Sequence, residues 1–78
     1  MPTVLKEGPY RLFFYSNEGN EPPHIHVEYE NSTAKFWLNP VELVRNHGIA
    51  SHRLTKVQSL VQEHRTQLLE AWHEHFSE

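Results

Sequence analysis

The segment from residue 24 to residue 38 most constrains what this chain can fold into, because polar and apolar side chains alternate through it without a fault. The sequence of residues 24–30 is His-Ile-His-Val-Glu-Tyr-Glu, and that of residues 33–38 is Thr-Ala-Lys-Phe-Trp-Leu. Successive side chains of a β-strand point to opposite faces of a sheet, so this pattern is typical of half-buried strands. Asn31 and Ser32 separate the two runs as a turn. The segment therefore predicts an antiparallel hairpin with one buried face and one open face.

A second hairpin is predicted at the start of the chain. Residues 3–6 and 10–16 are rich in β-branched and aromatic residues, and the turn residues Gly8 and Pro9 lie between them. Residues 16–23 hold Gly and two Pro and are expected to form a loop. Arginine is usually found on the solvent-exposed face of a sheet. We therefore expect one alternating set of side chains of the second strand on the open face and the other set in the core. The first set is Arg11, Phe13 and Tyr15, and the second is Tyr10, Leu12 and Phe14.

Helices are predicted after residue 38. Asn39-Pro40-Val41-Glu42 offers an N-cap acceptor, a proline at the first helical position and a Glu placed for a capping box. We therefore expect a short helix from Pro40 to about Asn46, ended by Gly48. A long helix, capped by Ser51, should then reach about Phe76. One half of this helix is mostly apolar and should cover the sheet; it comprises Leu54, Val57, Leu60, Val61, His64, Leu68, Ala71, Trp72 and His75.

Together these elements predict an α+β fold, in which an antiparallel sheet of about four strands, built from two hairpins, packs on one long C-terminal helix and a short helix. The length of 78 residues fits a single domain spanning residues 1–78. No apolar run approaches the roughly 20 residues of a membrane span. The first residues also lack the basic and apolar regions of a signal peptide, so a cytoplasmic protein is expected, with no membrane partner.

Composition excludes some classes of function. The chain has no cysteine, which rules out disulfides and every zinc site that needs thiolates. Seven Lys and Arg against ten Glu give a net charge of -3, which disfavours generic binding of nucleic acid by charge alone. Seven histidines make this charge dependent on pH, since free histidine titrates near about pH 6.5.

The open face of the predicted sheet carries the candidate site, beside the loop of residues 18–23. Two histidines, a tryptophan, further aromatic residues and an arginine on one face are unusual for a surface that contacts only water. Exposed aromatic patches usually mark binding sites. The side chains expected on it are Arg11, Phe13, Tyr15, His24, His26, Glu28, Glu30, Thr33, Lys35 and Trp37.

Three interpretations of His24 and His26 are open. Residues two apart on a strand lie side by side, about 6.5–7 Å apart at the backbone, so both rings can reach one small object. They would bind zinc or another divalent metal, with Glu28 continuing the same face. Alternatively they act as general acid and base, or as a phosphate clamp, in cleaving RNA, while Arg11 or Lys35 stabilises negative charge. In the third interpretation both are ordinary exposed strand residues or hydrogen-bond Glu28.

The histidines of the predicted long helix are less informative. His64 and Trp72 lie within its apolar half, and we expect both in the core. If the helix packs near an edge of the sheet, His64 would instead reach the loop after Ser16. His73 and His75 diverge on a helix and form a poor metal pair.

Several segments of the chain are distinctive when taken together. They are Met-Pro-Thr-Val at residues 1–4, Tyr-Arg-Leu-Phe-Phe-Tyr-Ser-Asn-Glu-Gly at 10–19, Glu-Pro-Pro-His-Ile-His-Val at 21–27, Ala-Lys-Phe-Trp-Leu at 34–38, Glu-His at 63–64 and Leu-Glu-Ala-Trp at 69–72. With these segments the chain resembles the small bacterial family called domain of unknown function 4160. The resemblance covers nearly the whole chain, and residues 21–27 are its most specific part. The resemblance implies a partner, a small protein encoded by a neighbouring gene, as in a toxin and antitoxin pair.

These observations lead to two functional expectations. In the first, the protein is the toxin-like member of the pair and acts on RNA, with local positive charge supplied by Arg11, Lys35 and Arg45. In the second, it is a non-enzymatic adaptor or metal-binding module that binds a partner protein, or a second copy of itself as a homodimer, through the same face. The catalytic candidates are His24, His26, Arg11 and Lys35, and the binding candidates are Trp37, Glu28, Tyr15 and Phe13.

Overall fold

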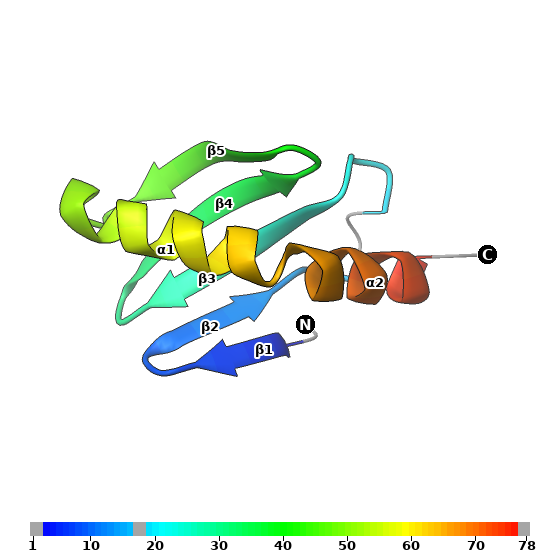
Figure 1. Cartoon of the computed structure of the whole chain (residues 1–78), viewed down its shortest axis with the longest axis horizontal. Helices are drawn as coiled ribbons and strands as arrows, with labels where there is room; N and C mark the ends of the chain where they lie inside the picture. The colour runs from blue at the N-terminus through cyan, green and yellow to red at the C-terminus, as the bar shows by residue number, and fades with distance from the viewer. Residues whose placement is uncertain (1–2, 17–18, 77–78) are drawn as a thin grey trace.

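The computed structural model describes residues 3–16 and 19–76. They form a five-stranded antiparallel sheet followed by two helices (Figure 1). The expected α+β fold is confirmed, with one strand more than the sequence indicated. Glu18 of the predicted loop lies outside the described residues. The elements are β1 (Thr3–Glu7), β2 (Tyr10–Phe13), β3 (His24–Tyr29), β4 (Ser32–Leu38), β5 (Val41–His47), α1 (Ser51–Glu63) and α2 (Arg65–Phe76).

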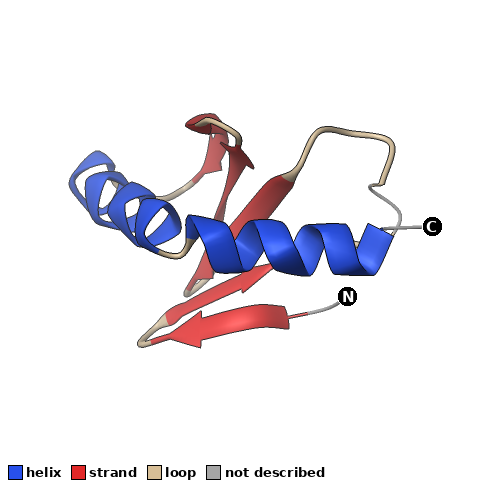
Figure 2. Ribbon diagram, turned by 45° about the vertical axis from the view of Figure 1, so that its right-hand side comes forward, coloured by secondary structure: helices blue, strands red, loops and turns tan. Residues whose placement is uncertain are grey.

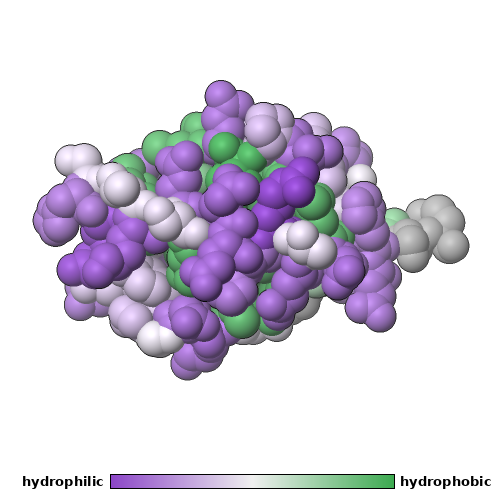
Figure 3. All heavy atoms as spheres, in the orientation of Figure 1, coloured by the Kyte–Doolittle hydropathy of each residue, from purple (hydrophilic) through white to green (hydrophobic). Residues whose placement is uncertain are grey.

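The strands follow one another in the sheet in chain order, and both helices lie on one face of it (Figures 1 and 2). The predicted assignment of the faces is confirmed, because the residues expected inside β3 and β4 are buried, with Tyr29 packed partly against them. The outer surface of the helical layer is largely hydrophilic, with apolar side chains visible between the polar ones (Figure 3). The buried core comprises Tyr10, Leu12, Phe14, Ile25, Val27, Ala34, Phe36, Leu38, Ile49, Val57, Val61, Leu68 and Trp72.

The first hairpin also has the predicted orientation. On β2, Arg11 pairs with Glu28 and Phe13 with His26 of β3, so these residues share the face turned away from the helices. Leu12 pairs with Val27 in the core. The strand ends at Phe13, however, so Tyr15 follows it rather than belonging to it.

The predicted short helix from Pro40 to Asn46 is wrong, because residues 41–47 form β5. Asn39 and Pro40 form the turn that reverses the chain after β4, and Val41 and Leu43 then pair with Leu38 and Phe36. The helix-capping pattern is local, whereas β5 satisfies its backbone hydrogen bonds along the edge of β4, and this tertiary pairing outweighs the capping preference. A register shift between Lys35 and Phe36 leaves Val44 as the extra residue of a β-bulge.

The predicted single long helix is interrupted at His64, so α1 and α2 meet at an angle (Figure 2). His64 is partly buried and lies at this junction. Arg65 anchors the start of α2, because its Nε donates a 2.8 Å hydrogen bond to the carbonyl of Leu38 and its Nη2 another of 2.8 Å to Asn39 Oδ1. The bend lets each half of the apolar stripe follow a different part of the twisted sheet, and Trp72 is buried as expected.

α1 is fixed to the sheet by Arg53. Its Nη1 donates a 3.0 Å hydrogen bond to the hydroxyl of Tyr10, and its guanidinium lies 4.3 Å from the ring centroid of Tyr29. The hydrogen bond with Tyr10 raises the pKa of Arg53 above its usual value. These contacts keep the helical layer on the core side and leave the opposite face of the sheet uncovered by helices.

Candidate functional site

The strand register places the candidate residues in rows across the open face. One row runs from β2 to β5 through Phe13, His26, Lys35 and Arg45, each opposite the next. Because β5 is a strand, Arg45 belongs to this row, which the sequence-based assignment to a helix did not show. The adjacent row contains Arg11, Glu28, Thr33 and His47, and a third joins His24, Trp37 and Glu42.

A pocket of about 200 Å³ opens between these rows. Of the seven described residues that line it, none is acidic. Two carry a cationic side chain, two carry an imidazole and two carry a hydroxyl, so six of the seven can donate a hydrogen bond to an anion. The lining residues are Tyr15, His26, Thr33, Ala34, Lys35, Arg45 and His47.

His26 is held in this pocket by aromatic rings. Its ring stacks on Phe13, with centroids 5.4 Å apart and 24° between the planes, and it makes an edge contact with Tyr15, with centroids 4.9 Å apart and 65° between the planes. Phe13 is only 3% exposed and Tyr15 is 44% exposed. Phe13 therefore packs against the imidazole from the neighbouring strand, whereas the exposed Tyr15 can itself contact a ligand.

His24 lies beside His26, as the spacing predicted, but it has no exposed surface. Its ring centroid lies 5.2 Å from that of His26 and 4.8 Å from that of Trp72 on α2. His24 Nδ1 is 3.0 Å from the carbonyl oxygen of Pro22, which fixes the proton on Nδ1, since a carbonyl only accepts. Of the predicted pair, only His26 is partly exposed at the open face, where a ligand can contact it.

Two ion pairs organise the charged residues around the pocket. Arg11 Nε donates to Glu28 Oε1 at 2.8 Å, and its Nη1 donates to Thr3 Oγ1 at 3.0 Å. Glu28 is thus engaged by Arg11, and Arg11 lies outside the pocket lining.

Lys35 makes the second ion pair with the loop before β3. Its Nζ lies 2.8 Å from Glu21 Oε1 and 5.1 Å from the ring centroid of Trp37. The same carboxylate oxygen is 3.8 Å from His24 Nδ1. Glu21 therefore draws the loop onto the open face, and any anion that reaches Lys35 competes with it.

The expected site for zinc or another divalent metal would need at least one further ligand beside His24 and His26. Within residues 3–16 and 19–76, no group of three or more potential ligand side chains is placed to hold a metal ion. His24 and His26 contribute two nitrogens, and Glu28 pairs with Arg11 instead of joining them. The donor set of the described residues does not fit a zinc cage, which needs at least three protein ligands.

Comparison with known families gives one result. Residues 10–73 match the family described as Domain of unknown function (DUF4160). The chain belongs to this family. The matched range contains every element of the open face from β2 to β5, including the pocket. No curated protein and no solved structure matches the chain.

The sequence-based prediction for this DUF4160 domain missed one pocket residue, His47, and the ion-pair partner of another, Glu21. His47 follows the predicted short helix, and Glu21 was predicted only as part of a loop. Arg45 and His47 are two residues apart, a spacing that puts both on one face of a strand, and this signal was available once β5 was recognised. Among the described helices of the domain, neither is long and apolar enough to cross a membrane.

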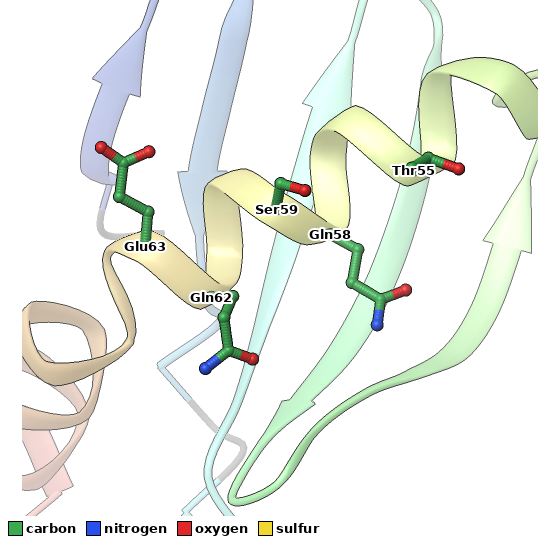
Figure 4. A pocket seen from close by; sticks show the side chains of 5 residues that line it. All are labelled: Thr55, Gln58, Ser59, Gln62 and Glu63. Atoms are coloured by element: carbon green, nitrogen blue, oxygen red, sulfur yellow. The ribbon is translucent and has the colours of Figure 1, made fainter.

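A larger depression, of about 530 Å³, lies along the exposed side of α1 (Figure 4). The labelled side chains splay outward from one helix rather than converge on a point. They are mostly uncharged, so this depression lacks the clustered donors of the open-face pocket. The lining residues are Thr55, Gln58, Ser59, Gln62 and Glu63.

Proposed function

We propose that this protein binds single-stranded RNA across the open face of its sheet, with one phosphate group in the pocket between His26 and His47. The observation that carries the proposal is the composition of the pocket lining, which combines Lys35 and Arg45 with imidazole and hydroxyl donors and has no acidic member among the described residues. Phosphate groups are recognised by such charge-assisted donors.

Aromatic side chains beside the pocket suit the bases of a single strand. Tyr15 lines the pocket and is exposed, and the partly exposed Trp37 is two residues from Lys35 on the same face. Stacking of a base on an aromatic ring contributes about 1–3 kcal/mol and depends little on sequence. A single strand with its bases unstacked would contact both rings, whereas a duplex presents no free base faces.

The net charge of -3 limits this binding to local contacts. Glu28 and Glu21 each pair with a cation of the open face. Only a small number of cationic side chains therefore attract phosphate. If Lys35 and Arg45 each neutralise one phosphate charge of the strand, the logarithm of the association constant should fall with the logarithm of the salt concentration with a slope of about -1.4. A strongly basic RNA-binding protein has a much steeper slope.

In the cell, this binding would make the protein the RNA-directed, toxin-like member of a two-gene pair in the cytoplasm. Its partner would be the small protein encoded by the neighbouring gene. The partner would restrain the protein by covering the open face, because the pocket and Trp37 lie together there.

Fluorescence anisotropy with a labelled pool of random single-stranded RNA, at salt concentrations between about 50 and 200 mM, tests the proposal. Arg45→Gln should weaken binding about fivefold and reduce the salt slope by about 0.7, as expected for loss of one phosphate contact. Lys56→Gln is the matched control, because Lys56 is exposed on α1, in the helical layer. Equal affinities of Arg45→Gln and the parent would show that the pocket does not hold the phosphate, and an absence of binding by the parent would refute the RNA proposal.

A second candidate function, an adaptor that binds a partner protein, is favoured by the edge strand β5. Its Leu43 and Val44 are 39% and 36% exposed, and β5 pairs only with β4 among the described strands. In this case Trp37 is the expected anchor. Trp37→Ala should weaken binding to the co-expressed product of the neighbouring gene by about 2 kcal/mol or more, as buried aromatic anchors do. An unchanged affinity would remove Trp37 from the interface.

A further inference from the structure

Two histidines line the open-face pocket, and they come from different strands. His26 is on β3 and His47 is on β5, with β4 between them. In the register, Lys35 is opposite His26 on one side and Arg45 on the other, while Thr33 is opposite His47. The two imidazoles therefore lie diagonally across the pocket, with two cations and a hydroxyl in the space around it.

This pair differs from the one that the sequence indicated. His24 is completely buried beneath Trp72 and is absent from the pocket lining, whereas His26 is partly exposed and His47 is exposed. His24 and His26 project from one strand, and His24 does not line the pocket, so this pair cannot flank a phosphate placed there. His26 and His47 can, because both line the pocket and β4 separates their strands.

We propose that His26 and His47 are the general acid and general base of a metal-independent cleavage of RNA in this pocket. The inference rests on the RNA binding proposed above and adds a reaction to it. General acid–base catalysis by imidazole requires groups within hydrogen-bond reach of both the attacking and the leaving oxygen. A phosphodiester seated between the two rings would present its two sides to them.

The reaction is an internal transfer of the phosphoryl group. One imidazole accepts the proton of the ribose 2′-hydroxyl, and the 2′-oxygen forms a bond to the neighbouring phosphorus. The bond between phosphorus and the 5′-oxygen of the next nucleotide breaks, and the second, protonated imidazole donates its proton to this leaving oxygen. The products are a 2′,3′-cyclic phosphate and a 5′-hydroxyl, and no oxidant, reductant or metal is consumed.

The other pocket residues fit the charge changes of this reaction. The non-bridging oxygens of the phosphoryl group gain negative charge as the 2′-oxygen attacks, and Lys35 and Arg45 lie beside each other where they can stabilise it. The stack on Phe13 and the edge contact with Tyr15 orient the imidazole of His26. His47 is placed by the pairing of its strand with Thr33.

The experiment incubates the protein with a random pool of single-stranded RNA in the presence of a chelator and identifies the product ends by mass spectrometry. We expect 2′,3′-cyclic phosphate and 5′-hydroxyl ends, and no cleavage of the matching DNA pool, which lacks the 2′-hydroxyl. His26→Gln and His47→Gln should each slow cleavage by at least about 100-fold. Each should change RNA affinity by less than about threefold, because glutamine keeps a polar side chain but cannot transfer protons.

His73→Gln is the matched control, since His73 is exposed on α2 and should retain the parental rate. If the parent protein binds RNA without cleaving it, the catalytic proposal is wrong and the binding proposal stands. If the parent protein neither binds nor cleaves RNA, both proposals are wrong. Cleavage that persists in the His26→Gln, His47→Gln double variant would also overturn it, because a contaminating or different active site must then be responsible. If His26→Gln abolished cleavage and His47→Gln did not, His47 would not be the general acid or the general base, and the proposal would be wrong.

Discussion

The ring of His24 lies 4.8 Å from the ring of Trp72, measured between the centroids, at a tilt of 56°. This contact joins the first residue of β3 to the last turns of α2, and the ring of Phe14 also lies 5.4 Å from that of Trp72. A residue selected from the sequence as half of a catalytic pair thus contributes to the packing between the sheet and the helical layer.

This contact predicts that His24 contributes more to stability than His26. His24→Ala should lower the free energy of unfolding by about 1–3 kcal/mol, because it leaves a cavity beneath Trp72 and removes the hydrogen bond to Pro22. His26→Ala, the matched control, should lose about 1 kcal/mol, since His26 is partly exposed and its ring contacts with Phe13 and Tyr15 lie on the open face. Urea denaturation followed by tryptophan fluorescence measures both. A loss in His24→Ala no greater than in His26→Ala would contradict the structural role of His24.

Glu21 is expected to weaken the binding of anions. Its carboxylate lies 2.8 Å from Lys35 Nζ and must be displaced before a phosphate can use that ammonium group. The Glu21 carboxylate is 40% exposed, so its ion pair is screened by water and contributes about 1 kcal/mol, and Glu21→Gln should tighten RNA binding by about two- to fivefold. Glu42→Gln is the matched control, because it removes an exposed carboxylate from the same face and measures the effect on RNA affinity of losing one negative charge. Equal gains in the two variants would show that the Glu21 ion pair has no specific effect.

Gly48 is expected to tolerate no side chain. Its φ is +99°, and a Cβ atom built there lies 2.8 Å from Ser32 Oγ. Gly48→Ala should therefore lower the free energy of unfolding by about 2 kcal/mol or more, through backbone strain and the close contact. Gly8→Ala is the matched control, because its φ is +58° but a Cβ atom there meets nothing within 4 Å.

Denaturation of both glycine variants and of Ser32→Ala, Gly48→Ala separates the two causes. Removing the Ser32 hydroxyl should restore part of the loss in Gly48→Ala. If Gly8→Ala and Gly48→Ala were equally destabilised, the contact with Ser32 would have no measurable cost.

Arg65 is expected to hold α2 at its bend. Arg65→Ala removes the two 2.8 Å hydrogen bonds to Leu38 and Asn39, and should destabilise the protein by about 1–2 kcal/mol. Lys56→Ala, which removes an exposed positive charge from α1, should change stability by less than about 0.5 kcal/mol. Thermal unfolding followed by circular dichroism compares them. Equal midpoints for the two variants would show that Arg65 does not anchor the helix.

The sequence by itself determined the faces of the central hairpin. Alternation over residues 24–38 predicted that Ile25, Val27 and Phe36 are buried and that His26 and Lys35 share the opposite face, and the register confirms both. This prediction succeeds because the period of a strand is local and only the number of residues between two side chains decides whether they share a face. The buried positions of the helices followed from the helical period for the same reason.

Tertiary structure decided the remaining features. Whether residues 41–47 form a helix or a strand depended on the free edge of β4, and this pairing placed Arg45 and His47 on the open face. The burial of His24 likewise depended on Trp72, which is 48 residues away in the sequence. Periodicity predicts on which face of the sheet a side chain lies. It does not predict whether a distant element covers that side chain, because this depends on where the distant element packs. The pocket is therefore a property of the packed chain, whereas the face on which it lies is already present in the alternation of the sequence.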